Sequence, residues 1–228
     1  MFTLVTVADV VQIPPKDFSK PSIRAIEDFI NTKYADKVIH RVGLCLGFHS
    51  LVSTSEGLIG HGTGIVNVNV DFRLIVFRPF KGEIIRATIT QSNPTGIYLS
   101  VDFYEDLVVP PETLFDNTSW DKDESGTWAF VWRAPNEEGE FNEFFFDNAE
   151  SCLMRIEEEQ WHDISPDALR SQAYETQEEE DQARRMPPYL IRGSMMNSGL
   201  GPELWWNGEG VEEADATAGA EDETMGGT

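Results

Sequence analysis

Residues 65–80 read IVNVNVDFRLIVFRPF, and this stretch determines how the rest of the chain is divided. Apolar side chains at the even positions alternate with polar side chains at positions 67–73. Alternation over this length predicts a half-buried β-strand, long enough to reach from one structural unit toward the next. Because Pro79 interrupts the pattern, we place the boundary between two units near Phe80.

Residues 1–80 have the pattern of a small α+β domain. An apolar run at 2–13 predicts a strand that ends at two prolines, and alternation at 41–48 predicts a second strand. Residues 55–64 contain four glycines and predict a loop, because glycine adopts backbone angles that other residues avoid. Between the two strands, a helix beginning near Pro21 has one face that we expect to be buried: Ile23, Ile26, Phe29, Ile30 and Tyr34.

Residues 81–207 have the pattern of an all-β domain. Gly82–Gln91 and Gly96–Tyr104 predict an opening hairpin, with Ile97, Leu99, Val101 and Phe103 on one face. Further strands are predicted at 108–110, 128–133, 141–146 and 152–159, with loops at 117–127 and 136–140. Residues 189–191 and 199–206 return to apolar character and together predict a last strand that docks on the barrel. Short strands at this spacing favour an OB-fold barrel of about five strands.

The acidic residues are unevenly distributed along the chain. The formal net charge is −23, and residues 81–164 contain 5 Lys and Arg against 19 Asp and Glu. An acidic excursion at about 165–186 contains QEEEDQ and predicts a solvated linker, and residues 208–228 predict a disordered acidic tail. Affinity for nucleic acid comes mainly from cations that neutralise phosphates. The composition therefore favours a protein partner, or a basic neighbour, over tight solitary binding of RNA or DNA.

No motif in the chain indicates catalysis, a cofactor or a metal. Phosphate-binding, dinucleotide-binding and nucleophile motifs are absent, and no lysine follows the GHGTG glycines. Cys45 and Cys152 lack the spacing of metal ligands and are typical of free, buried thiols. No apolar run approaches the length of a membrane helix, so we expect no membrane association.

The opening hairpin contains the best candidates for contact with single-stranded RNA: Lys81, Arg86 and Tyr98. OB barrels bind single strands by stacking bases on aromatic rings while cations follow the backbone. Two interpretations remain open. In the first, these three residues contact RNA. In the second, Tyr98 is an ordinary exposed strand residue and Arg86 pairs with one of the many carboxylates.

Four segments together resemble one known family. IVFRPFKGEIIRATIT, followed by GIYLSVDFYEDLVVPPETL, resembles the RNA polymerase stalk subunit that joins a tip domain to an OB barrel of the ribosomal S-one type. MFTLVTVADVVQIPP is similar to the first strand of that family, and PPYLIRGSMMNSGLGPELWW looks like the RNA polymerase III member. The resemblance covers about residues 1–207.

The resemblance implies a non-catalytic subunit of nuclear RNA polymerase III that acts in initiation on tRNA, 5S rRNA and other short noncoding genes. It implies a heterodimer with the smaller helical stalk subunit, contacts with the polymerase III core and initiation factors, and a position near nascent single-stranded RNA. The loop of Gly60, His61, Gly62, Thr63 and Gly64 would be the tip that contacts the core polymerase. The alternative is a free-standing OB-fold protein that binds single-stranded RNA.

Overall fold

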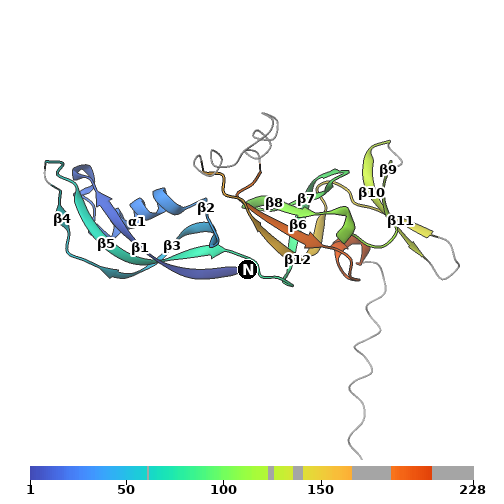
Figure 1. The fold of residues 1–228 in the computed structure, drawn as a ribbon, viewed down its shortest axis with the longest axis horizontal. Coiled ribbons are helices and arrows are strands. Elements are labelled where there is room, and N and C mark those ends of the chain that lie inside the picture. The colour runs from blue at the N-terminus through green and yellow to red at the C-terminus, as the bar shows by residue number, and fades with distance from the viewer. Residues whose placement is uncertain (61, 123–125, 136–140, 166–185, 207–228) are drawn as a thin grey trace, which may run out of the picture.

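The computed structural model describes residues 1–60, 62–122, 126–135, 141–165 and 186–206. The molecule is elongated (Figure 1), with an N-terminal α+β unit at one end and an all-β unit at the other. The predicted acidic excursion and tail fall almost entirely on residues outside those ranges, so both stay predictions. Within the described ranges, no helix has the length and apolar character needed to span a membrane.

The N-terminal unit is built on one antiparallel sheet with the order β1-β5-β3-β2. The long central strand β5 (Val66–Phe77) pairs with β1 (Phe2–Ile13) on one side and with β3 (Gly43–Thr54) on the other. The short strands β2 (Lys37–Ile39) and β4 (Leu58–Ile59) pair with β3 and β5, respectively. The alternating strand predicted at 65–80 is therefore the centre of the unit.

The helix α1 (Ser22–Tyr34) covers one face of this sheet and follows a short 3-10 turn, η1 (Pro15–Asp17). Its residues Ile26 and Ile30 are buried against the even-numbered residues of β5, as predicted. Ile23 was expected on the same face, but its side chain is 64% exposed. The buried position in the first turn is Ala25, because only one narrow stripe of the helix touches the sheet.

The second unit contains a closed five-stranded barrel, as the sequence predicted. Its ring order is β6 (Ile84–Asn93), β7 (Gly96–Val101), β8 (Tyr104–Val109), β13 (Tyr189–Ser194) and β12 (Ser151–Trp161), and β12 returns to β6. The β8–β13 pair is parallel, and the other pairs are antiparallel. β12 pairs with β6 from Ser151 to Arg155 and with β13 from Arg155 to Trp161. A register shift lies between Ile156 and Glu158 in the pairing with β13.

A separate three-stranded sheet is inserted between β8 and β12. Its strands are β9 (Thr118–Lys122), β10 (Trp128–Pro135) and β11 (Phe141–Phe145), in the order β11-β10-β9. The predicted strands at 128–133 and 141–146 exist but lie outside the barrel ring. The prediction of a loop at 117–127 was wrong, because β9 occupies its first half. Polar residues on either side of Trp120 hide this strand in the sequence, whereas its pairing with β10 forms it.

The two units share part of their hydrophobic core. Phe77 at the end of β5 and Leu44 on β3 are buried within the barrel cluster. Phe77 packs its ring against Phe103 and Tyr104, at centroid distances of 5.0 and 5.5 Å. Phe103, predicted on the apolar face of the hairpin, remains 39% exposed. β5 ends before Phe80 and β6 begins after it. The boundary between the units near Phe80 stays a prediction.

The C-terminal segment returns to the barrel. The short strand β14 (Gly201–Pro202) pairs with β12, and the 3-10 turn η3 (Glu203–Trp205) follows it. Trp205 packs against Phe146 and Trp132, at centroid distances of 4.7 and 5.5 Å. Another 3-10 turn, η2 (Pro111–Thr113), lies between β8 and the inserted sheet. The tryptophan-rich return predicted at 199–206 therefore docks on the barrel, as a two-residue strand and a turn.

Candidate interaction surfaces

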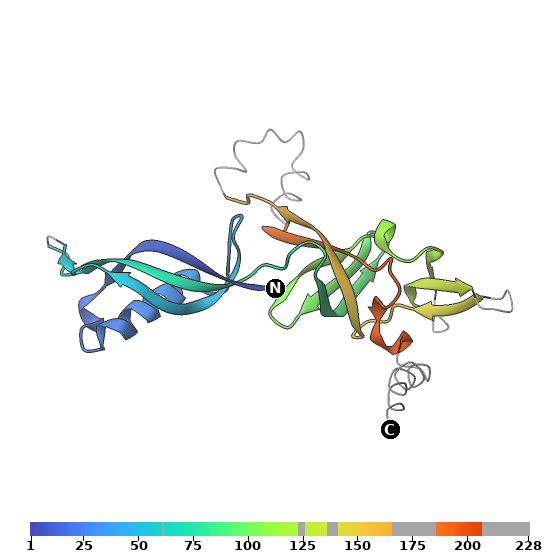
Figure 2. The same cartoon turned by 90° about the horizontal axis from the view of Figure 1, so that it is seen from below.

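The glycine-rich loop forms the outer end of the N-terminal unit (Figure 2), where the chain passes from β4 into β5. The backbone N–H of Gly60 donates a hydrogen bond to the Ile65 carbonyl at 2.9 Å, which closes the loop. Gly62 and Gly64 have φ values of 75° and 66°, in the left-handed region that favours glycine. His61, which the sequence also predicts at the tip, lies outside the described residues.

Two exposed apolar side chains lie beside this loop. Leu58 and Ile59 on β4 are 70% and 72% exposed, more than any other large hydrophobic residue that the structure describes. A Cβ added at Gly62 would meet no atom within 4 Å apart from its chain neighbours, so Gly62 faces open space. A narrow loop beside unburied Leu and Ile is suited to contact with an apolar crevice of another protein.

The predicted RNA contacts do not converge on the barrel. Lys81 lies in the turn before β6, Arg86 lies on β6, and Tyr98 lies on β7 opposite Gln91 of β6. Gln91 lies five positions after Arg86 on β6, which corresponds to roughly 16 Å along the strand. The three side chains therefore follow one hairpin but do not form one compact site.

Arg86 has a carboxylate partner within the chain. Its Nε and Nη2 atoms lie 2.8 and 2.7 Å from Oε1 of Glu203, which the C-terminal return brings beside β6. The hydroxyl of Tyr98 lies 3.3 Å from Oγ1 of Thr95 in the hairpin turn. Arg86 thus pairs with an acid, as in the second interpretation, whereas Tyr98 is half-buried; contact of these residues with RNA stays a prediction.

The junction between the two units contains a polar and aromatic cluster. Arg78, just after β5, donates from Nη2 to Glu159 of β12 at 3.0 Å and from Nη1 to the Arg41 carbonyl at 3.0 Å. The Arg78 guanidinium lies 5.8 Å from the ring of Trp161, which stacks on Tyr189 at 4.0 Å. These contacts join β5, the β2–β3 hairpin and the barrel.

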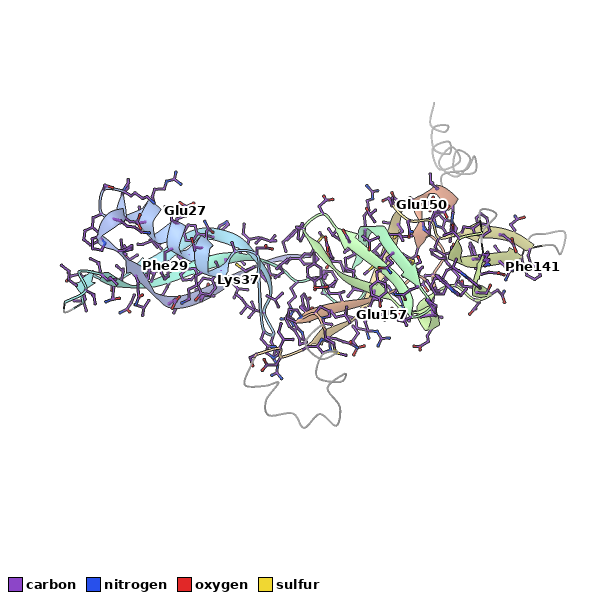
Figure 3. The ribbon with its side chains drawn as sticks, turned by 90° about the horizontal axis from the view of Figure 1, so that it is seen from above. Glu27, Phe29, Lys37, Phe141, Glu150 and Glu157 are labelled. Atoms are coloured by element: carbon purple, nitrogen blue, oxygen red, sulfur yellow. The ribbon has the colours of Figure 1, made fainter. Side chains whose placement is uncertain are left out.

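The electrostatics of this cluster favour the charged pair. The hydrogen bond to Glu159 raises the pKa of Arg78 despite partial burial, so the guanidinium stays charged. Burial raises the pKa of the Tyr189 phenol, whose hydroxyl donates to Glu159 at 3.2 Å. Figure 3 labels Lys37 on β2 of the N-terminal unit and Glu157 on β12 of the barrel. A groove of about 640 Å³ at this junction is lined by Met1, Thr3, Arg78, Pro79, Phe80, Lys81, Ile156, Glu157, Glu158 and Glu159.

Within the described ranges, no group of three or more His, Cys, Asp or Glu residues could hold a metal ion. The buried thiols have little nucleophilic character, because burial raises the pKa of Cys45 and raises that of Cys152 to about 12. The features that the described residues offer are thus surfaces: an apolar tip, a groove at the junction and an acidic barrel.

Comparisons with known proteins agree with this architecture. Residues 8–64 match the model of the SHS2 domain found in the N terminus of Rpb7p, Rpc25p and MJ0397, and residues 83–206 match that of RNA polymerase III subunit Rpc25. The chain is 36% identical over 207 residues to DNA-directed RNA polymerase III subunit rpc8 of Schizosaccharomyces pombe, covering 90% of this chain and 100% of the relative.

Two further relatives have the same name. The RPC8 proteins of Saccharomyces cerevisiae and Bos taurus are 33% and 32% identical, over 90% of this chain and over 100% and 98% of their own lengths, respectively. The fold thus defines a protein with an SHS2 domain followed by an OB-like barrel. The chain belongs to the RNA polymerase III subunit Rpc25 family, as the resemblance of its sequence implied.

Sequence reasoning missed the junction and the apolar residues of the tip. Arg78 and Glu159 are separated by 81 positions, and no local pattern pairs them. Leu58 and Ile59 did leave a signal, since two large apolar residues between glycines in a loop have no evident core to enter. That signal could have directed attention to β4 as well as to the glycines.

Proposed function

We propose that this chain is a non-catalytic stalk subunit of nuclear RNA polymerase III that supports initiation on tRNA, 5S rRNA and other short noncoding genes. Its membership of the Rpc25 family, with relatives named as polymerase III subunits over nearly their whole length, carries the proposal. The described residues offer surfaces and no constellation for catalysis, which agrees with a subunit that acts by binding.

The tip is the surface through which the chain would contact the core polymerase. Leu58 and Ile59 are exposed at the outer end of the molecule, beside the loop Gly60–Gly64. Contact of these apolar side chains with water is unfavourable, and a partner that covers them removes this cost. In this proposal the five loop residues fix the shape of the tip, and the two apolar side chains supply its binding energy.

The junction would receive the smaller helical stalk subunit. It combines the 640 Å³ groove with exposed aromatic side chains, since Phe2 and Phe80 are 51% and 64% exposed. A partner seated here would contact both units at once. It would also cover apolar area that a solitary chain leaves in water.

The barrel would face initiation factors more readily than RNA. Residues 81–164 have 19 acidic residues against 5 basic ones, which repel phosphates and attract basic protein surfaces. Initiation factors with basic faces fit this charge. Nascent single-stranded RNA stays a partner to be tested.

The experiment is affinity purification of a tagged chain expressed in cells, followed by identification of the proteins recovered. Recovery of a small helical subunit together with polymerase III core subunits supports the proposal. A chain that purifies alone as a stable monomer contradicts it.

The second candidate function is that of a free-standing protein that binds single-stranded RNA, which the OB-like barrel favours. It predicts that the purified chain binds an oligouridylate with strong dependence on salt. Replacing Lys81, Arg86 and Tyr98 together with alanine should then abolish binding. Glu203→Gln should strengthen binding, because it leaves Arg86 without its carboxylate partner. Unchanged binding in both variants excludes this function for the hairpin.

A further inference from the structure

The inserted sheet presents one exposed tryptophan at the end of the molecule opposite the tip. All six tryptophans lie in described residues, and Trp128 is the one whose side chain is exposed, at 52%. Its ring is parallel to that of Trp120, with an interplanar angle of 7° and centroids 6.2 Å apart. Trp120 in turn packs edge-on against the buried Phe130 at 4.9 Å. Trp128 is thus a supported aromatic surface rather than a loose side chain.

A cation already lies over this ring. Lys122 of β9 is directly opposite Trp128 of β10 in the sheet register, and its Nζ lies 5.3 Å from the ring centroid. The face of an indole attracts cations through its quadrupole, and guanidinium groups occupy such sites more often than ammonium groups. Arg also stacks its planar group on an aromatic ring, which Lys cannot do.

The net charge of residues 81–164 as a whole selects the kind of partner. Four described arginines of the all-β unit are paired with carboxylates: Arg86 with Glu203, Arg133 with Asp121 and Glu143, Arg155 with Glu157, and Arg192 with Glu158. The 19 acidic residues of 81–164 outnumber the 5 basic ones, so this segment keeps a large net negative charge. This field repels a phosphate backbone and attracts a cationic peptide.

We propose that Trp128, supported by Trp120, is a docking site for an arginine-containing basic segment of a protein partner. An arginine of that segment takes the place of Lys122 over the indole, while the acidic surroundings hold the remaining cations. The aromatic rings belong to this sheet and the negative charge to the all-β unit, so the inference holds whether or not the chain acts as a polymerase stalk subunit.

The experiment measures binding of the full chain to three labelled probes by fluorescence anisotropy: a peptide of about nine arginines, a lysine peptide of equal length and an oligouridylate. We expect the arginine peptide to bind at least about fivefold more tightly than the lysine peptide. Trp128→Ala should abolish this preference, and Trp128→Phe should keep part of it. Phe141→Ala is the matched control, since Phe141 is 59% exposed on the same sheet and is labelled in Figure 3.

The Lys122→Ala variant distinguishes whether a basic peptide or RNA binds at Trp128. Removing the Lys122 ammonium exposes the face of the Trp128 ring and removes a charge that repels arginine. Affinity for the arginine peptide should therefore rise. The same change removes a cation that a phosphate would use, so any affinity for the oligouridylate should fall. The proposal is overturned if Trp128→Ala retains the arginine preference. It is also overturned if Phe141→Ala loses that preference equally, or if the oligouridylate alone depends on Trp128.

Discussion

Arg78 and Glu159, which lie 81 positions apart, form an ion pair between the N-terminal unit and the barrel. The Arg78 guanidinium donates to both carboxylate oxygens, with N–O distances between 3.0 and 3.3 Å, and also to the Arg41 carbonyl. Because Nε and Nη2 bind one carboxylate and Nη1 binds the Arg41 carbonyl, this arginine ties the end of β5 to the barrel and to the turn between β2 and β3.

Replacing Arg78 with alanine should lower the free energy of unfolding by roughly 1 kcal/mol, since it removes charged hydrogen bonds from a partly exposed site. Arg78→Lys should recover only part of this, because an ammonium cannot reproduce the planar set of donors. Urea denaturation measures both. Arg24→Ala is the control, since Arg24 pairs with Glu27 but is 70% exposed. Equal losses in the Arg78→Ala and Arg24→Ala variants would contradict the role of the junction.

Phe77→Ala should destabilise both units together. The side chain is fully buried in the barrel cluster although it belongs to β5, and truncation of a buried phenylalanine costs about 3–5 kcal/mol. All six tryptophans lie between Trp120 and Trp206, so their fluorescence follows the barrel, while circular dichroism of α1 follows the N-terminal unit. Both signals should shift to lower denaturant. A shift in one signal alone would show that the units unfold independently, and Phe80→Ala, at a 64% exposed residue, should shift neither.

Leu58→Asp combined with Ile59→Asp should abolish recovery of polymerase core subunits with the tagged chain. Both side chains are more than two-thirds exposed, so the folded monomer should lose less than about 0.5 kcal/mol. Leu204→Asp serves as the control, because Leu204 is 67% exposed on the turn η3 of the barrel unit, away from β4. Affinity purification and thermal unfolding test the two halves of this prediction. Undiminished recovery with both aspartates would exclude these side chains from the contact.

Asp9 should make the stability of the N-terminal unit depend on pH. Burial raises the pKa of its carboxyl, but hydrogen bonds from Lys33 at 2.5 Å and Tyr34 at 2.7 Å outweigh burial and leave the pKa below its ordinary value. A depressed folded-state pKa stabilises the protein above the unfolded-state pKa, near 4. That stability is lost as the pH falls through the folded-state value.

Asp9→Asn should therefore be less stable than the native chain at neutral pH, by about 1 kcal/mol, and the difference should shrink below about pH 4. Urea denaturation across this range, monitored by circular dichroism of α1, measures it. Asp28→Asn is the control, since Asp28 pairs with Lys20 but is 59% exposed. A difference that is the same at every pH would rule out the titration of Asp9 as its cause.

Local patterns were sufficient to predict the main elements. The alternation in 65–80 identified the central strand β5, and the helical spacing of Ile26 and Ile30 identified the face of α1 that packs on it. The spacing of strands after Phe80 predicted the barrel, and the glycines between 55 and 64 predicted the loop that became the tip. The signals for the strand and the helix are local, because the two sides of a strand or helix are set by its own repeat.

Only the tertiary structure decided which distant residues meet. It placed Phe77 of the first unit in the core of the second, brought Glu203 onto Arg86 across 117 positions, and formed β9 from a polar stretch by pairing it with β10. It also left Lys81, Arg86 and Tyr98 spread along one hairpin. Such contacts depend on closure of the barrel and on the path of the chain between its units. A local repeat therefore determined what each segment forms, and the topology determined what each segment touches.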